Sequence, residues 1–255
     1  MFSRRDHARW RVALALLGGV LAGVTTAAEP TGPRDRPPNI VVIMADDLGV
    51  GDLGCYGQTL IKTPRIDRLA TEGTRFTHAY AGAPVCAPSR CVLMTGLHTG
   101  HARVRDNSGL VGGVADEMSA AGEGHRIPLL DEDVTVAEIL KQAGYATGIT
   151  GKWGLGEAGS TGEPNRQGFD ESYGFLNQNH AVFHFPDYLW RDGRREVIEA
   201  NRDGSRGRYA GDLFADAAAD FMRRHRDRPF FLYVPFTLPH ADFEVPSQGD
   251  YADRE

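Results

Sequence analysis

The segment Cys86-Ala87-Pro88-Ser89-Arg90 contains residue types that can bind an anion and react with it. Pro88 suits the first position of a helix, because that position needs no N–H and uses the φ that proline already has. Cys86 would then lie just before the helix, beside unpaired backbone N–H groups and the positive end of the helix dipole. This predicts that Cys86 lies at an anion site. The simpler alternative is a buried cysteine acting as a small apolar residue.

Four other polar residues follow apolar runs of the chain. Asp46 and Asp47 follow the run 39–45, and two such carboxylates can hold Ca²⁺ or Mg²⁺, or else form a hydrogen-bonded turn. Lys152 and His240 each follow another apolar run. A lysine there can neutralise an oxyanion or extend into solvent, and the histidine can be catalytic or an ordinary loop residue. The residue types are compatible with a metal-assisted site for an anionic substrate, and the simpler alternatives stay open.

The elements expected to position these residues alternate between strands and helices. We predict strands over 39–45, 75–80, 145–150 and 229–236, and helices over 63–73, from Cys86 onward, over 135–144 and over 212–226. The near-continuous apolar run 39–45 is typical of a strand buried on both faces of a parallel sheet. Residues 101–126 are expected to form a long surface loop. The alternation predicts an α/β fold with a doubly wound, mostly parallel sheet flanked by helices.

In such a sheet, ligands bind at the carboxyl ends of the strands. The predicted strands end just before Asp46-Asp47, Cys86, Lys152 and His240. We therefore expect these side chains to converge at one edge of the sheet. The helix after Val134 should begin with a capping box of Thr135 and Glu138.

The N-terminal residues have the composition of an export signal. Four arginines precede the apolar run 12–24, and small residues follow it at 26–28. This predicts a signal peptide over 1–28, then a Pro-rich linker over 29–38 and a catalytic domain over 39–255. The apolar run is shorter than the ~20 residues of a bilayer span, so we expect no stable membrane span. The predicted location is periplasmic or secreted.

The charge and the cysteine count argue against a nucleic-acid-binding, lipid-surface-binding or disulfide-rich protein. The chain has 255 residues and a formal charge of −6. Removal of residues 1–28 takes away four arginines and Asp6, a net +3, and leaves −9. A chain this acidic has no general attraction for nucleic acid or anionic lipid. The three cysteines are too few for a disulfide framework.

Two of these segments resemble the signatures of one family. Residues 86–90 resemble the sulfatase signature Cys-x-Pro-Ser-Arg, and residues 151–156, Gly-Lys-Trp-Gly-Leu-Gly, resemble the second signature, Gly-Lys-Trp-His-Leu-Gly. Over residues 39–246 the chain resembles the formylglycine-dependent, arylsulfatase-like sulfatases of the alkaline phosphatase superfamily. This resemblance implies that a formylglycine-generating or anaerobic sulfatase-maturating enzyme oxidises a cysteine to formylglycine. The implied site residues are Cys86, Arg90, Lys152 and His240 for catalysis, with Asp46, Asp47 and Cys86 as ligands of one Ca²⁺.

The chain departs from the family pattern in two ways. Gly154 stands where many sulfatases have a catalytic histidine, which leaves its role open to His101, His180 or His184. Sulfatases are also longer, with a second pair of metal ligands and another lysine after the region where this chain stops. The resemblance therefore implies the N-terminal part of a sulfatase, with a sheet that is incomplete at the C-terminus.

The expected activity is hydrolysis of sulfuric esters. Residues 177–190 combine amide, imidazole and aromatic groups, which suit sugar hydroxyls and ring faces, so we expect sulfated carbohydrates as substrates. One alternative is a phosphonate monoester or phosphodiester hydrolase of the same superfamily. The other is an inactive truncated fragment that only binds.

Overall fold

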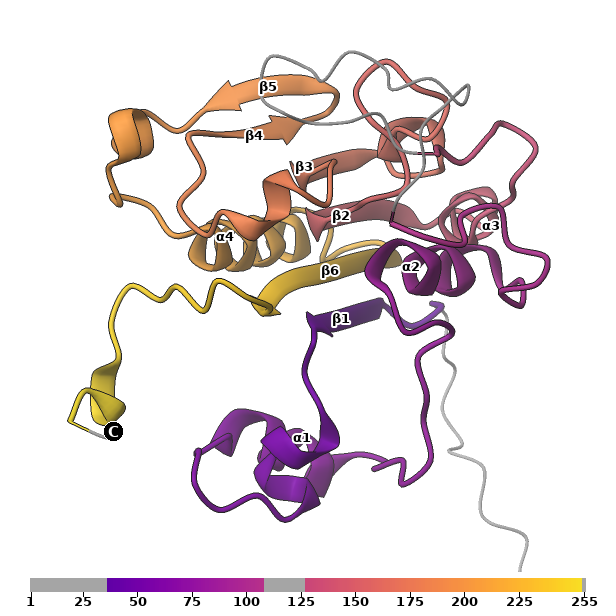
Figure 1. Ribbon diagram of the computed structural model, residues 1–255. Coiled ribbons are helices and arrows are strands. Elements are labelled where there is room, and N and C mark those ends of the chain that lie inside the picture. Colours follow the sequence, from indigo (N-terminus) through magenta and orange to yellow (C-terminus); the bar gives the residue numbers. More distant parts are fainter. Residues whose placement is uncertain (1–35, 108–126, 254–255) are drawn as a thin grey trace, which may run out of the picture. The chain divides into compact units, whose positions relative to one another are not determined.

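The computed structural model describes residues 36–107 and 127–253. The predicted signal peptide, most of the linker and residues 108–126 of the predicted loop lie outside these ranges. Six strands form one sheet in the order β1-β6-β2-β3-β4-β5 (Figure 1). Their bounds are β1 Ile40–Asp46, β2 Ala146–Lys152, β3 Glu171–Phe175, β4 Tyr188–Arg191, β5 Arg194–Val197 and β6 Phe230–Pro239.

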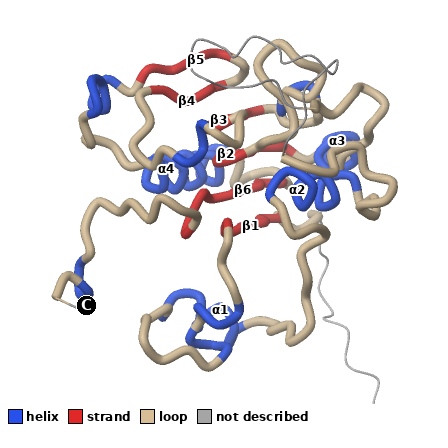
Figure 2. Tube along the Cα trace, viewed as in Figure 1, coloured by secondary structure: helices blue, strands red, loops and turns tan. Residues whose placement is uncertain are grey.

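The sheet is mostly parallel, as predicted. β1, β6, β2 and β3 pair in parallel, whereas β4 and β5 add an antiparallel hairpin at one edge. Of the four α-helices of the described residues, α2, α3 and α4 lie against this sheet, whereas α1 lies apart from it, below β1 in the view of Figure 2. Their bounds are α1 Pro64–Glu72, α2 Cys86–Thr95, α3 Val136–Gln142 and α4 Ala210–Arg224.

Strand β6 shows why the fold is doubly wound. Alternate residues of a strand point to opposite faces. Phe231 and Tyr233 pack in a core with residues of α2 and α3. Phe230 and Leu232 pack in another core with Phe221 of α4. Helices therefore cover both faces of β6, which confirms the expected α/β fold flanked by helices.

Local signals located most of the helices correctly. Thr135 and Glu138 form the predicted capping box: the Glu138 N–H donates to Thr135 Oγ1 and the Thr135 N–H donates to Glu138 Oε2. Helix α2 begins at Cys86 itself, so Pro88 occupies the third helical position instead of the first, and our placement of Cys86 before the helix was wrong. No helix in the described ranges is long and apolar enough to cross a bilayer.

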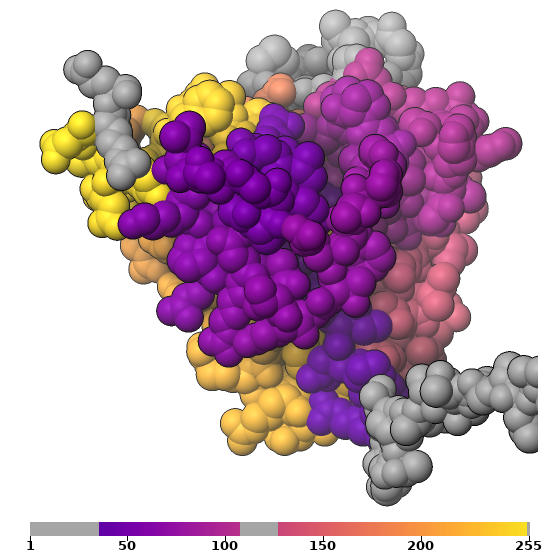
Figure 3. Space-filling view, turned by 90° about the horizontal axis from the view of Figure 1, so that it is seen from below, coloured from indigo at the N-terminus to yellow at the C-terminus, as the bar shows by residue number. Residues whose placement is uncertain are grey.

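Two strand predictions need correction. Residues 75–80 form no strand, and Phe76 and Tyr80 are exposed, because no neighbouring strand pairs with this segment. Strand β1 is present but is buried on one face only. Val41 and Ile43 are 41% and 64% exposed, since the core that α4 forms with β6 does not extend over them. The segments that follow β1, in purple, form much of the face seen in Figure 3.

Candidate active site

An ionic cluster joins the ends of two strands and a helix. Asp46 ends β1 and Lys152 ends β2, with β6 between them. Lys152 Nζ lies 2.8 Å from Asp46 Oδ2, and Arg90 Nη2 lies 3.3 Å from the same oxygen. A second Arg90 nitrogen, Nη1, donates to the Lys152 carbonyl. The three side chains are almost fully buried. Two fixed cations therefore meet one carboxylate at the carboxyl edge of the sheet.

This arrangement keeps Asp46 ionised. Burial by itself would raise the pKa of Asp46, but the charges of Lys152 and Arg90 and the hydrogen bond from Lys152 act against burial. The net result is a pKa below the usual range of an aspartate. An ionised carboxylate is a hard oxygen donor of the kind that Ca²⁺ and Mg²⁺ bind.

Cys86 lies beside this cluster. Its Sγ is 3.5 Å from Asp46 Oδ1, and it occupies the first turn of α2, where the helix dipole is positive. Arg90 is four residues later, on the same helix face, so both side chains point toward Asp46. The Ala87 N–H donates to Asn107 Oδ1 at 2.9 Å. The helix thus brings the candidate nucleophile and a guanidinium to one carboxylate.

Asp47 and His240 form a more open side of the site. Asp47 has a positive φ of 63°, and its side chain is 66% exposed. His240 directly follows β6, and its Nε2 lies 3.7 Å from Asp47 Oδ2. Every site residue predicted from the strand ends is therefore found at the carboxyl edge of the sheet. The buried side contains paired charges, and the open side contains a histidine that solvent can reach.

The three expected metal ligands do not form a ready-made cluster. Within 36–107 and 127–253, no group of three or more His, Cys, Asp or Glu side chains is placed to hold a metal ion. Asp46 contacts Cys86, while Asp47 lies near His240. The donor types still fit Ca²⁺, because Asp46 is ionised and Asp47 is accessible.

Comparison with known proteins decides the family. A family model described as Sulfatase matches residues 38–255, most of the chain. The protein belongs to the sulfatase family. Arylsulfatase A of Homo sapiens is 37% identical over 265 residues, which cover 94% of this chain and 46% of the human protein. N-acetylgalactosamine-6-O-sulfatase of Bacteroides thetaiotaomicron is 40% identical, covering 87% of this chain and 52% of that protein.

A solved structure agrees with the fold of this chain. That protein, in complex with its substrate D-glucosamine-2-N,6-O-disulfate, is 31% identical and superimposes with a TM-score of 0.64. The match covers 81% of this chain and 35% of the solved one. The chain spans about half the length of the two curated sulfatases that it matches.

The departure of Gly154 from the family signature has a structural counterpart in this chain. Gly154 has a φ of +78°, and a Cβ placed there would lie 1.7 Å from Gln178 Nε2. Gln178 is buried, and its Nε2 donates to the Gly154 carbonyl at 3.4 Å. A residue with a side chain therefore cannot replace Gly154 while Gln178 keeps its place. Gln178 was not among the site residues predicted from the sequence, although the altered signature at Gly154 and the amide groups of residues 177–190 were the signals that could have indicated it.

The three histidines considered as substitutes differ in their surroundings. His101 is exposed. His180 is buried, with its ring 4.8 Å from that of Phe175 and 4.1 Å from that of Tyr188. Burial lowers the pKa of His180 to about 4, and burial also lowers the pKa of His184. Both buried rings are thus held in the neutral form at pH 7.

Proposed function

We propose that this protein hydrolyses sulfate esters with a nucleophile made from Cys86. The observation that carries the proposal is the contact between Cys86 Sγ and Asp46, in a cluster that also contains Arg90 and Lys152. This cluster offers a reactive position next to two cations that can bind an anionic ester. Membership of the sulfatase family and similarity to an arylsulfatase support the same reaction.

The modification and the metal would act through residues already described. Formylglycine at position 86 would supply, as its hydrate, an oxygen nucleophile in place of sulfur. A Ca²⁺ ion would add positive charge next to the sulfate, and Asp46, Asp47 and modified Cys86 would hold it. The maturating enzyme that oxidises Cys86 is then a necessary partner.

The cations of the chain have separate tasks. Arg90 and Lys152 are buried and fixed by Asp46, so they need little rearrangement when sulfate binds and charge develops on its oxygens. His240, on the open side, can donate a proton to the departing alcohol. The buried side would therefore bind the sulfate, and the open side would receive the leaving group.

We further propose a sulfated carbohydrate as the substrate. The similar proteins include an N-acetylgalactosamine-6-O-sulfatase and a protein solved with a glucosamine disulfate, which supports this class. The aromatic residues of the segment 177–190 support it less than expected. Tyr188 is buried against His180, whereas Phe183 is 57% exposed and free to contact a sugar ring.

Two measurements test the proposed reaction. The first is mass spectrometry of the peptide containing Cys86, from protein produced with a maturating enzyme; an intact thiol would contradict the proposed nucleophile. The second compares release of sulfate and phosphate from paired esters of the same alcohols. Preferential sulfate release is expected. Preferential cleavage of the phosphate or phosphonate esters would assign the protein to that chemistry instead, and no turnover would leave a binding role.

The proposed location is periplasmic or secreted. Residues 1–28, with four arginines before an apolar run, support export with cleavage after Ala28. N-terminal sequencing of the protein recovered outside the cytoplasm tests this. A first residue at Glu29 is expected, and a chain that stays inside with its first 28 residues intact would contradict export.

A further inference from the structure

The side chain of Gln178 occupies the place that residue 154 leaves empty. Trp153 and Gly154 continue the pairing of β2 with β3, because their N–H groups donate to the carbonyls of Phe175 and Leu176 at 2.8 and 3.1 Å. Lys152 points to the ionic cluster and Trp153 into the core. Gly154 comes two residues after the end of β2, and Gln178 comes three residues after the end of its parallel neighbour β3, so both lie at the carboxyl edge of the sheet, where the ionic cluster is. Gln178 fills the space that a side chain at position 154 would need.

The orientation of the Gln178 amide follows from its neighbour. The Gly154 carbonyl can only accept a hydrogen bond, so the NH₂ group of Gln178 must face it. The Gln178 oxygen then points elsewhere, and this buried Oε1 has no hydrogen-bond partner in the described residues. A buried acceptor without a donor costs free energy, which a ligand with a hydroxyl group would recover.

An unpaired amide oxygen alone does not mark a binding site. Gln167 is equally buried and its Oε1 also lacks a partner, yet its NH₂ group bonds to the carbonyls of Leu130 and Thr161 in a different part of the fold. Gln178 differs because it lies on the glycine two residues after Lys152. Position and chemistry together single it out.

We propose that Gln178 is a specificity-determining residue whose Oε1 accepts a hydrogen bond from a substrate hydroxyl next to the sulfate ester. This inference rests on the proposed sulfatase activity. It assigns the substrate class more closely, to sulfate esters of polyols or sugars that carry a free hydroxyl near the ester. Since an amide does not titrate, this recognition is independent of pH, unlike that of a histidine at position 154.

The test crosses variants of the protein with substrates that lack single hydroxyls. The protein, produced with a maturating enzyme, is given the monosulfated hexose that it hydrolyses best and the deoxy analogues of that sugar. We expect the wild type to lose about ten- to a hundredfold in kcat/KM when the recognised hydroxyl is removed. On the intact sugar, Gln178→Met should show the same loss of kcat/KM relative to the wild type. Removal of the recognised hydroxyl should then lower the kcat/KM of Gln178→Met no further.

Three controls separate recognition from damage. Gln167→Met removes a matched oxygen elsewhere and should keep the wild-type preference. Gln178→Asn keeps an amide but withdraws its oxygen, and should lose the same discrimination as Gln178→Met. The aryl ester 4-nitrophenyl sulfate has no neighbouring hydroxyl, so all variants should hydrolyse it like the wild type.

The possible outcomes separate a failure of the Gln178 inference from a failure of the proposed function. The inference is overturned, while the sulfatase activity stands, if both Gln178 variants keep the wild-type preference for every hydroxyl. It is also overturned if they lose as much kcat/KM on 4-nitrophenyl sulfate as on the intact sugar. If the wild type releases no sulfate from any ester despite formylglycine at position 86, the proposed function fails, and the inference fails with it.

Discussion

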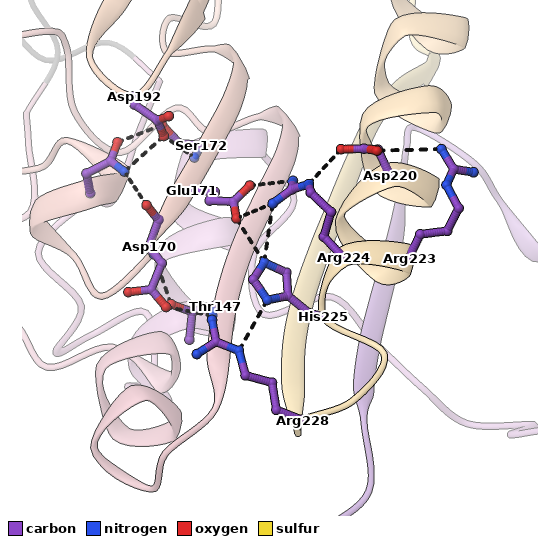
Figure 4. A network of polar contacts seen from close by, with 11 residues as sticks. Thr147, Asp170, Glu171, Ser172, Asp192, Asp220, Arg223, Arg224, His225 and Arg228 are labelled. Atoms are coloured by element: carbon purple, nitrogen blue, oxygen red, sulfur yellow. Dashed lines mark hydrogen bonds and ion pairs between the residues drawn. The ribbon is translucent and has the colours of Figure 1, made fainter.

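Two networks of carboxylates and arginines lie at opposite ends of the parallel strands. At the carboxyl ends, Asp46 meets Lys152 and Arg90 in a buried cluster. At the amino ends, Glu171 begins β3 and bonds both to Arg224, at the end of α4, and to His225 (Figure 4). Both networks pair a carboxylate with basic side chains, but the side chains of Glu171 and Arg224 are 36% and 47% exposed, whereas those of the Asp46 cluster are buried.

The difference in burial gives the two networks different consequences. Removal of one partner from a buried cluster leaves a charge that water cannot reach, which is costly. In a half-exposed network, water and salt replace the lost partner. The buried cluster can thus keep charges aligned for an incoming anion, whereas the network around Glu171 only joins α4 to the sheet. The following predictions test this contrast, in order of expected effect.

The largest loss of stability is expected for Asp46→Asn. It leaves Arg90 and Lys152 as two buried cations without a carboxylate, and should lower the free energy of unfolding by about 3–5 kcal/mol. Urea unfolding measures this. The matched control is Asp47→Asn, whose exposed side chain should change stability by less than about 0.5 kcal/mol. Equal effects of the two substitutions would remove the distinction between the buried and open sides.

A second prediction uses a group that is as buried as Asp46 but ionises in the opposite sense. His180 titrates near pH 6.5 when unfolded, whereas burial lowers its folded pKa to about 4. The charge of Asp187 opposes this shift more weakly than burial causes it, and the charge of Arg195 adds to it. The unfolded chain thus binds the proton more readily between these values. Stability should be complete above pH 6.5 and fall by about 3 kcal/mol as the pH drops to 4.

Urea unfolding at several pH values checks the His180 prediction. The control His180→Phe keeps an aromatic ring against Phe175 and Tyr188 but cannot take up a proton. It should be less sensitive to acid between pH 6.5 and 4. If the variant and the wild type lose stability in parallel, acid sensitivity arises elsewhere.

A smaller loss is expected from Glu171→Gln, because its partners remain partly hydrated. The substitution should cost about 1 kcal/mol, since Glu171 is held by two nitrogens of Arg224 and by His225. Glu72→Gln, in the exposed pair with Arg68 on α1, is the control and should cost about 0.3 kcal/mol. A cost for Glu171→Gln near that of Asp46→Asn would mean that exposure does not weaken the network.

Salt should produce the smallest effect and separate the networks. A rise from 0.01 to 1 M NaCl shortens the screening length from ~30 to ~3 Å. The destabilisation by Glu171→Gln should shrink by less than about 1 kcal/mol and nearly vanish, while that by Asp46→Asn should persist. Thermal or urea unfolding of the three proteins at both salt concentrations measures the difference. The same salt dependence for both variants would contradict a water-poor ionic cluster.

The sequence alone predicted the parts of the fold that depend on local signals. The capping box at Thr135, the proline near the start of α2 and the apolar runs of β2 and β6 indicated the helices and strands of an α/β sheet. Because parallel strands end at the same edge, the residues after each run could be assigned to one site. Lys152 followed from this rule, whereas Cys86 and Arg90 followed from the signature that contains them, because the strand predicted before Cys86 is absent.

The tertiary structure decided everything that depends on neighbours distant in the chain. The two cations bonded to Asp46 come from positions 44 and 106 residues away, and no local pattern specifies that they share one oxygen. The exposed face of β1 depends on where α4 packs, and the absence of a strand at 75–80 depends on which strands are available to pair. Gln178 filled the space above Gly154 for the same reason, because steric exclusion acts between atoms in contact and not between neighbours in sequence.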